Sequence, residues 1–206
     1  MLIQHFITGP LGVNCYLVID ENTKTGFIVD PGGESGKLVQ AVKEKGVNVT
    51  HLILTHGHPD HLCGLDFYQR TFPEILVVAH EAECDMLSDA KKNQSAMYCG
   101  KPVSVEPDIT VSDMDTMKIG DLELLFIHTP GHTKGGMCIY LDGTLFSGDT
   151  LFQNSIGRTD FPYSSYPAIR SAIKDKLFVL PAETVVYPGH EGFTTIGHEK
   201  EHNPFV

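Results

Sequence analysis

One short segment, THGHPDH at residues 55–61, gathers four side chains that can bind metals or move protons: His56, His58, Asp60 and His61. Residues two apart on a helix point to different faces, so His56 and His58 can converge only from a turn. Gly57 and Pro59 favour such a tight turn. Four candidate ligands exceed the need of one ion, because a catalytic site also keeps a position open for water. The segment therefore predicts a catalytic centre with more than one metal ion.

Three further segments share a pattern in which an apolar run ends in a glycine and then in a His or Asp. They are HTPGHT at 128–133 with His132, SGDT at 147–150 with Asp149, and PGHE at 188–191 with His190. Glycine lets the backbone turn sharply and bring the next side chain to a shared edge. Loops at the edge of a sheet commonly carry functional residues. We therefore expect these three side chains to meet the first four. His128 is expected to pack or to hydrogen-bond.

The elements that position these residues alternate along the chain. We expect strands at 14–20, 26–30, 51–55, 75–79, 122–128, 137–141, 144–147 and 184–187, and helices at 35–45, 61–71, 81–92 and 167–177. Residues 93–108 lack periodicity, contain Pro102 and Pro107, and are expected to form a mobile flap near the site. One predicted strand ends in Asp30, and another leads to Asp149 in the second half of the chain. This repeated pattern of a strand followed by an aspartate favours two sheets, one from each half.

The bulk composition is that of a globular domain, with 206 residues, 41% hydrophobic and 20% charged. A net charge of −11 would repel a phosphate backbone, so we expect no nucleic-acid partner. No apolar run reaches the length of a membrane span, and the N-terminus lacks a secretory pattern. The five cysteines are odd in number and include no CxxC pair. We therefore expect buried cysteines without a disulfide framework, no membrane partner, and a reducing, cytoplasmic location.

The four motifs, in this order and spread through the chain, resemble the metallo-β-lactamase superfamily. They are most similar to its short bacterial type II glyoxalase-like (hydroxyacylglutathione hydrolase-like) branch. The likeness covers residues 1–206 and implies one domain of the α/β class, an αββα sandwich of two mixed sheets flanked by helices. By resemblance, one metal ion would be held by His56, His58 and His132. The other would be held by Asp60, His61 and His190, and the two would be bridged by Asp149.

The resemblance implies a metal-dependent thioester hydrolase, with S-lactoylglutathione as the model substrate. Two cations would lower the pKa of a bridging water toward ~7, and the resulting hydroxide would attack the carbonyl carbon. Asp60 is the candidate catalytic residue that orients this hydroxide. Five histidines and two aspartates favour two Zn²⁺ ions, with Fe²⁺ or Mn²⁺ as alternatives. The expected partner is therefore a small-molecule thioester, glutathione-linked in the simplest case.

Substrate contacts are the least specified part of the site. Arg158 is the candidate contact for an anionic substrate, and its competing role is an ion pair with Asp160 that fixes a loop. Lys134 and Tyr187 flank predicted ligands and are weaker candidates. Only 16 residues follow His190. The glutathione pocket of the long type II glyoxalases, which uses a C-terminal helical domain, is therefore not carried over.

Other functions remain open at this point. Persulfide dioxygenases resemble the same fold but use a single Fe²⁺, held in this numbering by His56, His132 and Asp149. A non-enzymatic zinc module is disfavoured, because structural zinc sites are closed and usually rich in cysteine. A secreted β-lactamase is disfavoured by the N-terminus. A nuclease is disfavoured by the acidic charge and by the lack of room for a nucleic-acid domain.

Overall fold

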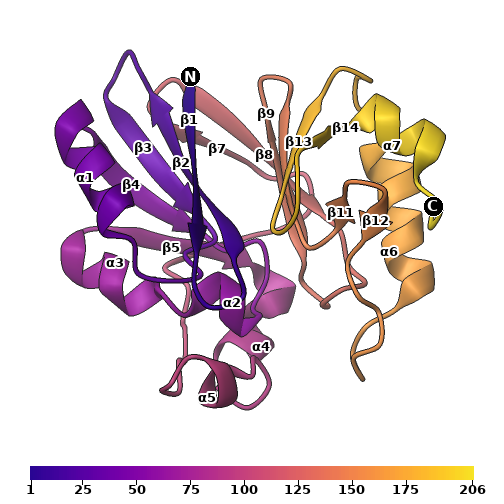
Figure 1. Cartoon of the computed structure of the whole chain (residues 1–206), viewed down its shortest axis with the longest axis horizontal. Coiled ribbons are helices and arrows are strands. Elements are labelled where there is room, and N and C mark those ends of the chain that lie inside the picture. The colour runs from indigo at the N-terminus through magenta and orange to yellow at the C-terminus, as the bar shows by residue number, and fades with distance from the viewer.

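The computed structural model describes residues 1–206 and contains two six-stranded sheets packed face to face (Figure 1). The order of the first sheet is β1-β2-β3-β4-β5-β6, and that of the second is β14-β13-β10-β9-β8-β7. Parallel pairs join β3 to β4, β4 to β5, β5 to β6, and β10 to β13. The other neighbours within these two sheets run antiparallel. The prediction of two mixed sheets, one from each half of the chain, is thus confirmed.

The first sheet and its helices come from the N-terminal half. Its strands are β1 (Leu2–Thr8), β2 (Val13–Asp20), β3 (Thr25–Val29), β4 (Asn48–Ile53), β5 (Leu76–His80) and β6 (Ile109–Val111). Its helices are α1 (Gly36–Lys45), α2 (Pro59–Leu62), α3 (Leu65–Thr71), α4 (Cys84–Leu87) and α5 (Ser95–Tyr98), with a 3₁₀ turn at Glu81–Glu83. Ser35 caps α1 by accepting the Leu38 N–H, and Gly46 ends it in the left-handed conformation.

The second sheet belongs to the C-terminal half. Its strands are β7 (Thr116–Ile119), β8 (Leu122–His128), β9 (Met137–Leu141), β10 (Thr144–Gly148), β13 (Val185–Pro188) and β14 (Thr194–Thr195). A separate small hairpin pairs β11 (Leu151–Phe152) with β12 (Ser155–Ile156). The helices are α6 (Tyr166–Ala172), which continues into a π-helical turn at Ile173–Leu177, and α7 (Ile196–His202).

Three hydrophobic clusters hold four layers together. The cluster between the sheets includes Tyr16 and Phe27 from the first sheet and Phe126 and Phe146 from the second. A second cluster packs α1 and α3 on the outer face of the first sheet, and a third packs α6 and α7 on the second. Figure 1 shows these helices outside the two sheets. The layers are therefore α, β, β and α, as the resemblance implies.

Two helices are shorter than the sequence predicts. The helix expected at 61–71 is broken between α2 and α3, where the Gly64 N–H donates to the Pro31 carbonyl. A Cβ at Gly64 would lie 2.6 Å from that oxygen, so a close backbone contact interrupts the helix. The helix expected at 81–92 is only a 3₁₀ turn followed by α4. Residues 93–108 contain only α5, and their mobility stays a prediction.

The prediction that the chain lacks disulfides is wrong. Cys63, between α2 and α3, is bonded to Cys99 at the end of α5. Cys15 and Cys138 are buried as expected, and Cys84 is half-buried and free. The pairing joins residues 36 apart in sequence, which no local motif reveals. None of the helices has the length and apolar character needed to cross a membrane.

Candidate metal centre

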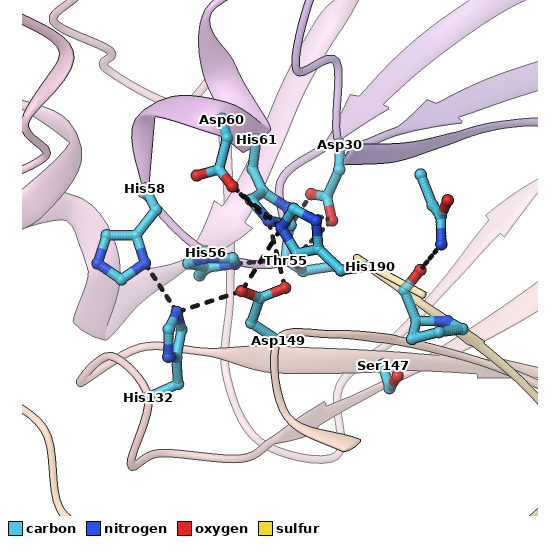
Figure 2. A network of polar contacts seen from close by, with 12 residues as sticks. Asp30, Thr55, His56, His58, Asp60, His61, His132, Ser147, Asp149 and His190 are labelled. Carbon is cyan, nitrogen blue, oxygen red and sulfur yellow. Dashed lines mark hydrogen bonds and ion pairs between the residues drawn. The ribbon is translucent and has the colours of Figure 1, made fainter. Parts of the chain in front are cut away.

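The predicted ligands follow the ends of four strands on one edge of the sandwich. THGHPDH connects β4 to α2, and His132 follows β8. Asp149 follows β10 directly, and His190 lies two residues after β13. Figure 2 shows all seven side chains pointing toward one another. The strand, glycine and ligand pattern thus predicts correctly which residues the fold brings together.

The first group consists of His56, His58 and His132. One ligand atom from each lies within 4.8 Å of the others, and all three rings are buried. His58 Nδ1 is 2.8 Å from His132 Nε2. The other nitrogen of each of these two rings is held from outside. His58 Nε2 is 2.7 Å from the Tyr163 hydroxyl, and His132 Nδ1 is 2.9 Å from the Arg158 carbonyl. These outer contacts fix which nitrogen faces the centre.

The second group consists of Asp60, His61 and His190, whose ligand atoms also lie within 4.8 Å of one another. Asp60 Oδ2 is 3.0 Å from His190 Nε2 and 3.8 Å from His61 Nε2. Asp60 and His61 are adjacent on α2, which begins with Pro59. Proline at the first helical position and aspartate in the first turn both favour a helix start there.

Asp149 lies between the two groups (Figure 2). Its Oδ1 is 3.3 Å from His61 Nε2, and its Oδ2 is 3.5 Å from His132 Nε2. The backbone around it leaves no room for larger neighbours. Gly148 has φ of +48°, and a Cβ at Gly189 would lie 2.4 Å from Asp149 Oδ1. Glycine is therefore required at both positions, and the carboxylate of Asp149 contacts a histidine of each group.

The donor set fits metal ions. His56 Nε2, His61 Nε2 and Asp149 Oδ1 are buried and have no hydrogen-bond partner. One ligand atom from each of the same three residues lies within 4.8 Å of the others. Buried polar atoms without partners are costly, and a cation among them would satisfy all three. Imidazole and carboxylate donors suit Zn²⁺ and also Fe²⁺ or Mn²⁺.

The pKa shifts of His56, His58 and Asp149 agree with metal binding, whereas nearby carboxylates raise the pKa values of His61 and His190 against the effect of burial. Burial lowers the pKa of His58 to about 3, with a further decrease from the neighbouring His132. Burial and the charge of His61 likewise hold the pKa of His56 well below its usual range. The pKa of Asp149 is also low: burial opposes this, but the charge of the nearby His61 outweighs it. Neutral imidazoles and an ionised carboxylate are the forms that bind metals.

Asp30, Tyr163 and Glu83, which the sequence did not single out as site residues, contact the predicted ligands or their backbone on the side away from the centre. Asp30 Oδ2 is 2.9 Å from His61 Nδ1, and Asp30 also accepts the Thr55 N–H. Tyr163 contacts His58. Glu83 accepts the backbone N–H groups of Gly57, in the loop of His56 and His58, and of Gly135, in the loop after His132. The strand ending in Asp30 was a usable indication, because it matches the strand before Asp149. Nothing in the sequence marks Tyr163 or Glu83.

An open cavity of about 490 Å³ leads to the centre. It is lined by five of the predicted ligands, and also by Leu11, Pro59, Gln94, Tyr98, Phe152, Arg158, Phe161 and Glu191. Arg158 forms its ion pair with Asp160 at 2.8 Å, and its guanidinium lies 4.7 Å from the centre of the Phe161 ring. The loop-fixing pair is therefore present, and Arg158 also faces the cavity.

The other two candidate substrate contacts lie elsewhere. Lys134 lines a smaller cavity of about 230 Å³, which Tyr163 also borders. Tyr187 lines neither cavity. Its ring packs against Tyr16 and Phe193, with centroids 5.6 and 4.7 Å apart. Side chains alternate along a strand, and in β13 this alternation turns Tyr187 toward the core between the sheets.

The family is identified by comparison with known proteins over most of the chain. The model of the metallo-β-lactamase superfamily matches residues 8–190, so the chain belongs to that superfamily. The chain is 36% identical to "Probable metallo-hydrolase YqgX" of Bacillus subtilis, over 96% of this chain and 94% of that protein. It is 33% identical to "Hydroxyacylglutathione hydrolase GloC" of Haemophilus influenzae, over 94% and 92%.

Solved structures give the same fold. The crystal structure of BLEG-1 B3 metallo-β-lactamase superposes with a TM-score of 0.90 at 35% identity, covering 99% of each chain. TTHA1623 in a di-iron-bound form gives 0.85 at 29% identity, covering 98% of this chain and 100% of that one. ETHE1 from Myxococcus xanthus gives 0.78 at 29% identity, covering 99% and 84%. The predicted fold class and superfamily are thereby confirmed.

Proposed function

We propose that this protein is a dinuclear metal-dependent hydrolase that cleaves a small-molecule thioester such as S-lactoylglutathione. The carrying observation is the seven-ligand cluster, whose buried unpartnered atoms lie beside an open cavity. The similarity to a hydroxyacylglutathione hydrolase along nearly the whole chain supports the thioester as substrate. The acidic net charge and the small cavity agree with a small-molecule rather than a nucleic-acid partner.

The proposed roles follow from where the side chains lie. The two ions would be held by His56, His58 and His132 on one side and by Asp60, His61 and His190 on the other, with Asp149 shared between them. When bound, the ions supply Lewis-acid activation of water and of the thioester carbonyl. Asp60 borders the cavity and is placed to accept a hydrogen bond from the attacking water. A thiolate leaves without full protonation, so the chain needs no dedicated general acid for this step.

The test combines metal content with turnover on one sample. The protein is purified without added metal, analysed for its elements, and assayed with S-lactoylglutathione. About two ions per chain with thioester hydrolysis support the proposal. The matched pair is Asp149→Asn, expected to lose both metal and activity, and Asp142→Asn on the β9–β10 turn, expected to keep both.

The competing activity gives a different result in the same assay. Persulfide dioxygenation needs only His56, His132 and Asp149, all three of which are present. The likeness to the di-iron-bound structure keeps iron among the candidate metals. About one iron per chain, no thioester hydrolysis, and O₂ uptake with glutathione persulfide would replace the hydrolase by the dioxygenase.

A further inference from the structure

Glu83 is a buried carboxylate outside the predicted ligand set. It ends the 3₁₀ turn after β5, and its side chain is 1% exposed. Its two oxygens accept two different backbone N–H groups. Oε1 is 2.8 Å from the Gly57 nitrogen, and Oε2 is 2.7 Å from the Gly135 nitrogen. Burial raises the pKa of Glu83, while these two N–H groups oppose the rise.

The two glycines belong to the two loops that carry the first group of predicted ligands. Gly57 lies between His56 and His58, and Gly135 lies three residues after His132. These loops are far apart in sequence, and Glu83 is 26 residues from Gly57 and 52 from Gly135. A single carboxylate therefore ties together the backbones from which all three histidines project.

Both loops lie directly on the turn that carries Glu83. A Cβ at Gly135 would lie 2.3 Å from the Glu83 nitrogen, so this approach requires glycine. A Cβ at Gly57 would lie 3.3 Å from Glu83 Oε1 and 3.1 Å from Met86 Cγ. In the second group, His190 follows β13, while Asp60 and His61 lie three and four residues after Gly57 but are held within α2.

We propose that Glu83 is a positioning residue that fixes the separation of the His56–His58 loop from the His132 loop and so sets the affinity of one metal ion. This inference rests on the proposed function, because it takes those histidines as ligands of one ion. Residues that hold metal ligands in place typically change metal affinity about 10- to 100-fold when mutated. The second ion, held by Asp60, His61 and His190, is expected to be much less affected.

Glu83→Gln is the sharpest variant. Glutamine keeps the shape but has one carbonyl oxygen, so its NH₂ group must face one of the two glycine N–H groups. One loop contact is lost without opening a cavity. Glu83→Asp keeps both acceptor oxygens on a shorter side chain, so it remains informative if the glutamine variant does not fold.

Glu199→Gln is the matched control. Glu199 on α7 is also 1% exposed, and its Oε2 accepts the Asn154 N–H at 2.9 Å and the Asn203 amide at 2.8 Å. It has no contact with either ligand loop. Its substitution therefore reports what the loss of a buried, hydrogen-bonded carboxylate does to the fold alone.

The measurement is the dissociation constant of each zinc ion, obtained by competition with a chelator, together with the thermal midpoint of the metal-free protein. Glu83→Gln is expected to lower the affinity for one ion about 10- to 100-fold and the affinity for the other less than about threefold. Glu83→Asp is expected to show a smaller loss at the same ion. Glu199→Gln is expected to lower the midpoint and to leave both affinities unchanged.

His58→Ala identifies which of the two affinities belongs to the first group, and Glu83→Gln must weaken that same ion. Unchanged affinities in Glu83→Gln and Glu83→Asp, or equal weakening of both ions, would overturn the role of Glu83. A wild-type protein that takes up no metal would instead contradict the proposed function. The two failures are therefore distinguishable on the same set of proteins.

Discussion

The Nδ1 atom of His61 lies 2.9 Å from Oδ2 of Asp30, and both side chains are almost fully buried. Asp30 also accepts the N–H and the hydroxyl of Thr55, which precedes the first ligand. Burial opposes a charged His61, yet the carboxylates of Asp30 and Asp149 raise its pKa well above the usual range. In a metal site, such a carboxylate fixes the histidine ring and increases its basicity toward the metal.

Asp30→Asn is therefore expected to lower the affinity for one metal ion about 10- to 100-fold. The affected ion is the one assigned to Asp60, His61 and His190. Elemental analysis after dialysis against a weak chelator measures the retained metal. Asp20→Asn is the control, since Asp20 is also a buried aspartate at a strand end and accepts the Asp121 N–H far from the site. Equal metal retention in both variants would contradict the role of Asp30.

The Cys63–Cys99 bond attaches α5 to the segment that follows α2. Residues Gln94 and Tyr98, at α5, line the cavity, and so do Pro59 and Asp60 on the neighbouring helix α2. The bond therefore joins two walls of the cavity. A cross-link across this many residues stabilises the folded state mainly by restricting the unfolded chain.

Cys99→Ser is expected to lower the free energy of unfolding by about 2–4 kcal/mol. It should also speed limited proteolysis between residues 93 and 108. Urea unfolding with and without a reductant measures the first effect. Cys84→Ser, which removes a free cysteine, is expected to unfold like the wild type. If reductant leaves the wild-type curve unchanged, the Cys63–Cys99 bond does not contribute to the free energy of unfolding.

The sequence predicts which seven side chains the fold brings together, because each one is marked by its local sequence. Each of His132, Asp149 and His190 follows an apolar strand and a glycine within a few residues. The ends of these strands lie at one edge of the sheet, so the loops that follow them meet there. The order of the motifs then indicates the superfamily. The core strands are predicted for the same reason, since their apolar runs are continuous.

The parts that the sequence did not predict depend on contacts between distant residues. Glu83 meets Gly57 and Gly135 across 26 and 52 residues. Tyr163 meets His58 across 105 residues. The break at Gly64 follows from a contact with Pro31, not from its own neighbours. None of these partners can be chosen from a single sequence without the fold, because many equally polar or small residues were available.

Arg158 combines both roles considered from the sequence. Its ion pair with Asp160 is exposed, and solvent-exposed pairs contribute little to stability. We expect Arg158→Ala to raise KM for an anionic glutathione thioester about two- to fivefold. KM for a neutral thioester and both kcat values should be unchanged.

Steady-state kinetics with the two substrates tests this prediction. Asp160→Asn is the paired variant, because it removes the competing carboxylate and leaves the guanidinium in place. We expect it to lower KM for the anionic thioester or leave it unchanged. An Arg158→Ala enzyme with the wild-type KM for both substrates would leave Arg158 with only its loop contact.

His80 provides a pH-dependent contribution to stability away from the metal ligands. Its ring is buried and stacks on His128, with centroids 4.0 Å apart and an interplanar angle of 13°. Burial, and then the nearby His128, lowers the pKa of His80 from 6.5 to about 4. Between these two values the unfolded chain binds a proton that the folded protein does not. Stability from this group is therefore complete above pH 6.5 and falls as the pH falls toward about 4.

His80→Asn removes the titrating ring and keeps an acceptor near the Ala82 N–H, which the ring now accepts at 3.2 Å. Between pH 7 and pH 4.5, we expect the variant to lose about 1–3 kcal/mol less unfolding free energy than the wild type. Urea denaturation at both pH values measures the two losses, and comparing them cancels metal release common to both proteins. His202→Asn, at the exposed end of α7, controls for the removal of a histidine. Equal losses in His80→Asn and wild type would mean that folding does not lower the pKa of His80.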